Sequence, residues 1–235
     1  VTAGYIHAEP RRAFFDKIGF LKPVSTQLPE VAGPLWPRHW MRINTMTIAF
    51  GHGISVTPLH LAMGSAAMIN GGILYQPSLV KRHAGSDKGR RVIQQKTSVS
   101  MRQLLRLNAV EGTGKNANVP GYEVGGKTGT AEKPGRGGYR QKALISSFVG
   151  AFPMNDPKFV VIVSLDEPKG LPETGGYATA GWVAAPSVKV IIEQMVSLYG
   201  ILPGDLKDGL PPIEIASTPV PPPVAPPQLV PASVR

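Results

Sequence analysis

The most clearly bounded hydrophobic segment is the apolar stretch Leu59–Ile69. Thr57 and Pro58 stand directly before this stretch, and these residue types are favoured at the N-cap and at the first position of a helix. Gly71 and Gly72 follow it and stop the helical pattern. The sequence therefore predicts a buried helix here.

Two further stretches have helical periodicity. One covers residues 98–110, where a helix is predicted to begin near Ser98 or Ser100. The other is predicted to open at Pro186 and to continue to Tyr199, with Gly200 closing it. The apolar face of this last helix is expected to cover a sheet.

Three stretches are typical of β-strands, at 122–133, 146–152 and 159–165. The last two are joined by residues 153–158, whose length and turn-forming composition predict a hairpin of antiparallel strands. Glycines interrupt the 122–133 stretch, and a glycine inside a strand often marks the close approach of a ligand or another backbone. The predicted fold is α/β in the α+β sense, an antiparallel sheet flanked by helices.

The two ends of the chain have a different composition. Residues 1–45 are rich in Pro, Gly and aromatic residues and predict one short helix followed by irregular chain. From Pro211 onward, proline alternates with Val, Ala and Ser, which favours an extended, disordered tail. We therefore expect one domain over residues 1–200 and a tail over 201–235.

Composition narrows the classes of partner and site. The net charge of +10 is spread over scattered Lys and Arg residues with no long run, which argues against nucleic-acid binding. The chain has no cysteine, which excludes thiol catalysis and disulfides. Its five histidines lack the spacing of metal ligands, so neither a metal nor a cofactor is expected.

Lys127-Thr128-Gly129-Thr130, on a predicted strand, is the best candidate for chemistry. The lysine supplies positive potential, the two hydroxyls can bind an anionic group, and Gly129 lets a substrate backbone lie against the strand. The backbone N–H of Thr130 could serve as an oxyanion donor. As a bare tetrapeptide, the motif also suits an edge strand with a solvated lysine.

The surrounding residues resemble the class B penicillin-binding proteins. The 122–133 string resembles the third active-site motif of that family, and Phe50–Leu59 resembles the segment upstream of it. The Gly112-Thr113-Gly114 turn falls where the family would place it, and the resemblance runs from about Ile18 to Tyr199. The Phe-Gly-His-Gly form at residues 50–53 is more similar to the cell-division members than to the elongation members.

This resemblance implies a peptidoglycan D,D-transpeptidase of septal cell-wall synthesis. A serine would attack the penultimate D-Ala carbonyl of a stem peptide, release D-Ala and pass the acyl group to a neighbouring amine. Lys127, Thr128 and Thr130 would bind the terminal carboxylate of the stem peptide or of a β-lactam, and the Thr130 amide would complete the oxyanion hole. The resemblance also implies cell-division partners and an inner-membrane anchor upstream, with this portion in the periplasm.

The nucleophile of the family is not convincingly present. The family needs a Ser-x-x-Lys motif and a Ser-x-Asn motif, and no Ser-x-Asn occurs in the sequence. Ser78 and Lys81 match the first motif, but Pro77 predicts an extended segment where a nucleophile should open a helix. We therefore expect a chain truncated at its N-terminus, whose nucleophile lies upstream of Val1 and which is inactive alone.

Other readings stay open at this point. A related serine carboxypeptidase or β-lactamase would share the Lys-Thr-Gly strand, and a non-catalytic binding module could have lost the serine. His60 is expected to be a packed histidine rather than a base. Asp166 and Glu167 are adjacent, so in a strand their side chains would point to opposite faces and make a poor catalytic pair.

Overall fold

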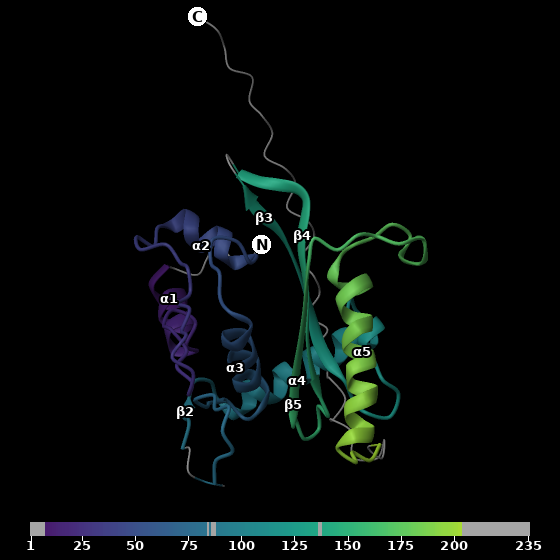
Figure 1. Cartoon of the computed structure of the whole chain (residues 1–235). Helices are drawn as coiled ribbons and strands as arrows, with labels where there is room; N and C mark the ends of the chain where they lie inside the picture. Colours follow the sequence, from purple (N-terminus) through teal and green to yellow (C-terminus); the bar gives the residue numbers. More distant parts are fainter. Residues whose placement is uncertain (1–7, 84, 86–87, 136–137, 204–235) are drawn as a thin grey trace, which may run out of the picture.

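The computed structural model describes residues 8–83, 85, 88–135 and 138–203. A three-stranded antiparallel sheet stands at the centre, with α5 against one face and α3 and α4 toward the other (Figure 1). This arrangement confirms the predicted antiparallel sheet flanked by helices. The predicted tail from residue 204 onward lies outside the described residues.

The sheet has the strand order β3-β4-β5. Its strands are β3 (Gly125–Gly135), β4 (Gly138–Phe152) and β5 (Phe159–Asp166). The hairpin predicted around residues 153–158 is confirmed, since Phe152 pairs with Phe159 and the two strands are antiparallel.

The predicted start of β4 at residue 146 is wrong by eight residues, because β3 and β4 form a hairpin that extends past the end of β5 (Figure 1). Pairing in this extension is irregular, with a register shift between Glu132 and Pro134. The glycine-rich and charged composition of this hairpin hid the strand, since it lacks the alternation that burial imposes.

Helix α3 (Pro58–Ile69) is confirmed at both ends. The Thr57 hydroxyl accepts a hydrogen bond from the His60 backbone N–H at 3.3 Å, and the Thr57 backbone N–H donates to Nδ1 of His60, also at 3.3 Å. Nε2 of His60 lies 2.8 Å from the Lys22 carbonyl. His60 is fully buried in this arrangement, as expected of a packed histidine.

Helix α4 (Gln95–Val110) begins before the predicted Ser98. Ser98 is buried inside the first turns, where its hydroxyl accepts from the Gly71 backbone N–H at 2.9 Å. Its side chain therefore connects α4 to the end of α3 rather than capping α4. The N-cap residue is Gln94, which makes no side-chain cap and left no signal in the sequence.

Helix α5 runs from Ala180 to Leu198, so the predicted start at Pro186 is wrong. Pro186 lies inside the helix, and Thr179 is the N-cap. The end is as expected, because Gly200 adopts a left-handed φ of +60° just past the helix. An internal proline costs one backbone hydrogen bond, which the burial of α5 against the sheet offsets.

The remaining elements are short and lie mostly before the sheet. Helix α1 (Ala8–Lys17) is the expected short helix, whereas α2 (Arg42–Ala49) was not predicted, because it has only eight residues and a methionine N-cap. Strands β1 (Ile73–Leu74) and β2 (Arg90–Arg91) form a second, two-stranded sheet. Single 3₁₀ turns are η2 (Lys115–Ala117) and η3 (Pro172–Thr174).

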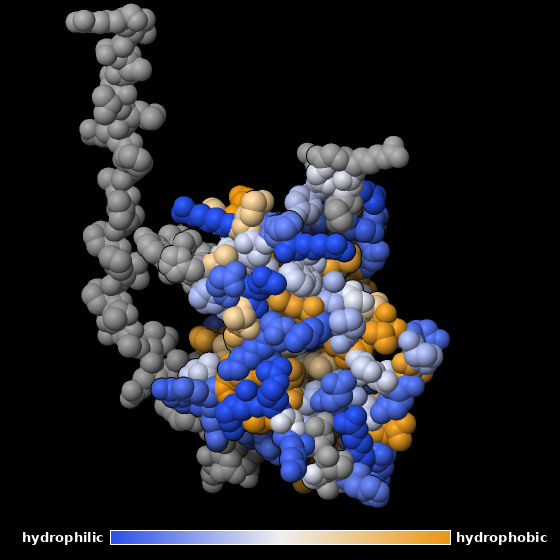
Figure 2. Space-filling model, turned by 90° about the vertical axis from the view of Figure 1, so that its left-hand side faces the viewer, coloured by the Kyte–Doolittle hydropathy of each residue, from blue (hydrophilic) through white to orange (hydrophobic). Residues whose placement is uncertain are grey.

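The largest hydrophobic cluster lies between the sheet and α5. It joins Phe148 and Phe152 of β4 to Val188 and Ile192 of α5, all fully buried. Smaller clusters lie under α3, one against α1 and Val92 and one against Met154. Apolar patches interrupt the polar surface seen from the side of α1 (Figure 2). No helix of the described residues is both long enough and apolar enough to cross a membrane.

Candidate functional site

The Lys127–Thr130 motif lies on β3, at the edge of the sheet. Within the described residues β3 pairs with β4 only, so its other side carries no strand. Backbone groups along such an edge can bind an extended peptide by adding it to the sheet. The motif therefore lies where a peptide ligand could be bound.

Two cavities flank the motif. One, of about 280 Å³, is lined by Lys127, Thr128 and Gly129 together with residues of α3 and α4. The other, of about 290 Å³, is lined by Thr128 and Thr130 together with Thr113, Lys115 and residues at the start of α5. Thr128 therefore borders both cavities, whereas Lys127 borders the first and Thr130 the second.

The glycines of β3 lie in two kinds of surroundings, one tightly packed and one open. A Cβ on Gly126 would lie 2.5 Å from the Phe148 ring and from the Val149 carbonyl, and one on Gly125 would lie 2.4 Å from Met154. A Cβ on Gly129 would meet nothing nearer than the Ser147 carbonyl, at 3.9 Å. The first two glycines are required for packing, whereas Gly129 leaves open space beside the motif.

A chain of hydrogen bonds connects β3 to α4 and to the glycine-rich turn. Lys127 Nζ donates to the Thr128 carbonyl at 2.9 Å and to the Thr128 hydroxyl at 3.0 Å. The Thr128 and Thr113 hydroxyls are 2.9 Å apart. Asn108 accepts from the Thr113 hydroxyl at 3.2 Å and donates to the Gly126 carbonyl at 2.8 Å.

The start of α5 is held against the same strand. The Ala180 backbone N–H donates to the Thr130 hydroxyl at 3.1 Å, and the Ser146 hydroxyl donates to the Ala178 carbonyl at 2.7 Å. Asn116 donates to the Gly181 carbonyl at 2.8 Å. Thr130 is therefore positioned by a helix that begins some fifty residues further along the chain.

Arg106 of α4 supports the chain where it enters β3. Its guanidinium donates to the Val124 carbonyl and to the Asn118 side chain, both at 2.7 Å. Burial lowers the pKa of Arg106 below its ordinary value, and the nearby Glu123 carboxylate opposes that shift. Arginine keeps its charge at neutral pH in any case, so this residue brings a permanent positive charge to the chain just before β3.

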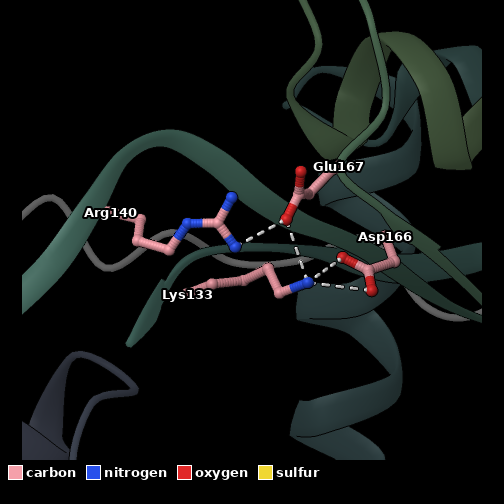
Figure 3. A network of polar contacts seen from close by, with 4 residues as sticks. All are labelled: Lys133, Arg140, Asp166 and Glu167. Atoms are coloured by element: carbon pink, nitrogen blue, oxygen red, sulfur yellow. Dashed lines mark hydrogen bonds and ion pairs between the residues drawn. The ribbon is translucent and has the colours of Figure 1, made fainter. Parts of the chain in front are cut away.

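Four charged side chains form an ion cluster near the C-terminal end of β3 (Figure 3). Lys133 lies 2.8 Å from Asp166 and 3.1 Å from Glu167, and Arg140 lies 3.0 Å from Glu167. Hydrogen bonds to Asp166 and Glu167 raise the pKa of Lys133, and the hydrogen bond from Lys133, followed by the charge of Arg140, lowers the pKa of Glu167.

The expectation that Asp166 and Glu167 diverge is wrong, since both carboxylates reach the same lysine. Glu167 lies one residue beyond β5 with a positive φ of +48°, so the alternation of a regular strand no longer applies to it. Each carboxylate is bound to a cation, an arrangement that joins β3, β4 and β5 and offers no free acid or base.

Ser78 lies outside the helices, in the segment after β1. Its hydroxyl donates to the Val80 carbonyl at 2.7 Å and accepts from the Gln27 side chain at 2.9 Å. It lines neither of the two cavities beside the motif. Among the described residues, no group of three or more His, Cys, Asp and Glu side chains could hold a metal ion.

The sequence indicates the Gly112-Thr113-Gly114 turn but assigns no positioning role to Thr113, to Asn108 or to the start of α5. Asn108 sits in a helix interior, where asparagine is a poor helix former, and that misfit is its local signal in the sequence. The contact between Thr130 and Ala180 joins residues far apart in the chain, and no spacing rule could have indicated it.

Comparison with known proteins gives one family. Residues 2–193 match the family model described as the penicillin binding protein transpeptidase domain. The chain is 39% identical over 198 residues to a probable peptidoglycan D,D-transpeptidase FtsI of Caulobacter vibrioides, covering 80% of this chain and 34% of that protein. It is 40% identical over 173 residues to the stage V sporulation protein D of Bacillus subtilis, covering 68% of this chain and 26% of that protein.

Solved structures show the same fold. The transpeptidase domain of penicillin-binding protein 3 from Burkholderia pseudomallei superimposes with a TM-score of 0.76 at 33% identity, over 86% of this chain and 61% of that chain. Penicillin-binding protein 3 of Mycobacterium tuberculosis, complexed with ampicillin, gives a TM-score of 0.73 at 25% identity, over 87% of this chain and 49% of that chain. The chain spans about a third or less of the length of the Caulobacter and Bacillus relatives.

Proposed function

Because the chain belongs to the penicillin-binding protein transpeptidase family, we propose that it forms part of a peptidoglycan D,D-transpeptidase that cross-links stem peptides during septal cell-wall synthesis. The observation that carries the proposal is Lys127–Thr130 on the free edge of β3, with a cavity on either side. An FtsI among the relatives supports the septal assignment.

In this proposal β3 binds the C-terminal end of the donor stem peptide. The Lys127 ammonium attracts the terminal carboxylate, and the hydroxyl face of the strand holds it by hydrogen bonds. The open space beside Gly129 admits the peptide backbone. The Thr130 backbone N–H stabilises the oxyanion formed when a serine attacks the penultimate carbonyl.

We propose that the serine nucleophile and its base lie in the part of the domain that this sequence does not contain. The chain has no Ser-x-Asn, and it covers 34% of the Caulobacter vibrioides relative. The serine would form an ester with the donor acyl group as D-Ala leaves, and an acceptor amine would then displace the serine. β-Lactams would acylate the same serine.

The domain division, the cellular location and the partners are proposed on the same basis. Residues 1–200 form the transpeptidase portion and residues 201–235 a separate tail, in agreement with the end of α5 at Leu198. The complete protein would act on the periplasmic face of the inner membrane, anchored by a helix outside this sequence. Its partners would be stem peptides and other cell-division proteins.

Labelling with a fluorescent penicillin tests the proposal. The purified chain is expected to give no covalent adduct by intact-mass spectrometry, whereas the longer protein encoded with the upstream sequence is expected to gain the mass of one opened β-lactam. Ser78→Ala is the control. An adduct on the chain that Ser78→Ala abolishes would show that the nucleophile is misplaced, and an unlabelled longer protein would overturn the proposed function.

A further inference from the structure

A third cavity, of about 510 Å³, lies at the C-terminal end of α5, which is the lower end of that helix in Figure 1. Three segments form it: Tyr122 and Glu123 before β3, the turn between β4 and β5, and residues 199–202. It shares no lining residue with either cavity beside the Lys127–Thr130 motif. The cavity is therefore separate from the proposed substrate site.

Aromatic side chains give this cavity its chemistry. The rings of Phe159 and Tyr199 lie 5.1 Å apart, and Phe159 stacks on the buried Phe152 at 5.3 Å. Tyr199 nevertheless remains 59% exposed. Within the part of the chain that the structure describes, neither the Tyr122 hydroxyl nor the Tyr199 hydroxyl makes a hydrogen bond. The cavity thus offers apolar rings and two hydroxyl donors that a ligand could use.

The charged residues of the lining already have partners. Lys158 lies 3.6 Å from Asp156. The Glu123 carboxylate accepts a hydrogen bond from the Asn155 backbone N–H at 3.2 Å, and it also interacts with the Arg106 charge. An uncharged ligand leaves these contacts intact, so the cavity suits a ligand that is apolar and carries backbone carbonyls for the two tyrosines.

The described chain ends at this cavity. Leu202 lines it and is 83% exposed. The next residue, Pro203, lies beside the segment that carries Tyr122, since a Cβ on Gly121 would be 3.3 Å from the Pro203 Cβ. The rest of the chain, residues 204–235, therefore continues from the wall of the cavity.

A segment of fitting chemistry follows within reach. Residues 219–227 read Pro-Val-Pro-Pro-Pro-Val-Ala-Pro-Pro and carry no charge. This composition favours polyproline II geometry, in which the backbone carbonyls have no internal hydrogen-bond partner. Grooves lined by aromatic residues recognise such segments in many proteins. Residues 204–218 separate Pro203 from the segment, and a random coil of about 15 residues spans about 20 Å on average, enough to turn back.

We propose that residues 219–227 bind in the cavity of the same molecule, with their prolines against Tyr122, Phe159 and Tyr199. Because both partners belong to one chain, the effective concentration of the segment at the cavity is on the order of 1 mM, so a weak contact is sufficient. The bound segment covers the rings that the end of α5 leaves exposed. The proposal does not depend on the proposed function, which concerns the motif on β3.

Photo-cross-linking in the longer protein encoded with the upstream sequence tests the proposal. With p-benzoylphenylalanine in place of Tyr199, irradiation is expected to join this position to the tryptic peptide that begins at Asp208 and contains residues 219–227. The matched control carries the probe in place of Tyr177, which is also 59% exposed but precedes the opposite end of α5. It should give severalfold less of this product. The probe at Leu202 repeats the test if the first variant fails to fold.

Proline variants then test which part of the tail is bound. Pro221→Ala, Pro222→Ala and Pro223→Ala, combined in the protein that carries the probe at position 199, should lower the yield of this product severalfold. Pro211→Ala combined with Pro212→Ala makes the same kind of change outside the segment and should leave the yield unchanged. Both variants keep the sequence through Pro203, so the cavity itself is not altered.

Several results would overturn the proposal. Equal yields from positions 199 and 177 would show that the tail has no preference for the cavity. A product from position 199 that contains residues upstream of Val1, or no product with the tail peptide, would show a different occupant or none. A product that joins two copies on a denaturing gel would show that the tail binds in another molecule. An unchanged yield in the triple proline variant would exclude residues 219–227 as the bound segment.

Discussion

At the scale of single residues, the glycines of β3 differ in how closely other atoms pack against them. Gly126→Ala is expected to lower the free energy of unfolding by about 1–3 kcal/mol, because the added methyl would overlap the Phe148 ring. Gly129→Ala, which meets open space, should change it by less than about 1 kcal/mol. Urea unfolding of both variants measures the difference, and similar losses in the two would contradict it.

The ion cluster at Lys133 predicts a particular pH dependence. The Glu167 pKa is lowered, so its contribution to stability is present above the unfolded pKa of about 4.3 and is lost as the pH falls through the folded pKa. The Lys133 pKa is raised, so its contribution is present below the unfolded pKa of about 10.4 and is lost as the pH rises through the folded pKa.

Lys133→Met should therefore lower the thermal unfolding midpoint mainly between about pH 5 and pH 9, with a smaller effect outside that window. Asp166 and Arg140 are exposed and Lys133 and Glu167 are half-buried, so the cluster is open to solvent ions, and about 1 M salt should also reduce the difference between variant and wild type. Lys158→Met, which breaks an exposed 3.6 Å pair with Asp156, is the control. A difference that stays constant down to about pH 3 would contradict the assignment.

At the scale of elements, helix packing depends on glycine positions, where another side chain occupies the space that a Cβ would fill. A Cβ on Gly64 of α3 would lie 2.5 Å and 2.8 Å from two carbons of the Phe20 ring. Gly64→Ala should therefore lower the free energy of unfolding by about 1–3 kcal/mol, although alanine is the better helix former by about 1 kcal/mol.

Combining Gly64→Ala with Phe20→Leu should recover part of that loss, since the smaller side chain makes room for the methyl. Chemical unfolding of the two single variants and the double variant gives the coupling between the two sites. If the effects of the single variants simply add, the contact between α3 and Phe20 is not the cause.

At the scale of the whole molecule, the core is divided unevenly. The cluster between the sheet and α5 holds large, fully buried side chains, whereas the clusters under α3 are small. Hydrogen exchange is expected to be slowest in β3, β4, β5 and α5, and faster in α1 and α2, through local opening. Equal protection in both regions would contradict this division.

Two variants test the division further. Val188→Ala, in the large cluster, should lower the free energy of global unfolding by about 2 kcal/mol and raise exchange throughout the molecule. Val92→Ala, in the small cluster with Ile18 and Ala67, should raise exchange mainly in α1 and α3. Mass spectrometry of exchanged peptides from the two variants distinguishes the patterns.

The sequence by itself determined the elements with strong local signals. Helix α3, with Thr57, Pro58 and its terminal glycines, and the hairpin between β4 and β5 followed from capping, turn chemistry and alternation. The Lys127–Thr130 motif and the family it indicates were also readable, because the four motif residues are contiguous within one strand.

Only the tertiary structure decided what depends on distant contacts. Burial against the sheet lets α5 run through Pro186, and pairing with β3 extends β4 back to Gly138. The hydrogen bonds of Asn108 with Gly126, of Thr113 with Thr128 and of Thr130 with Ala180 likewise join segments that are separated in the sequence. Such contacts arise from packing between distant segments, which local propensity does not describe.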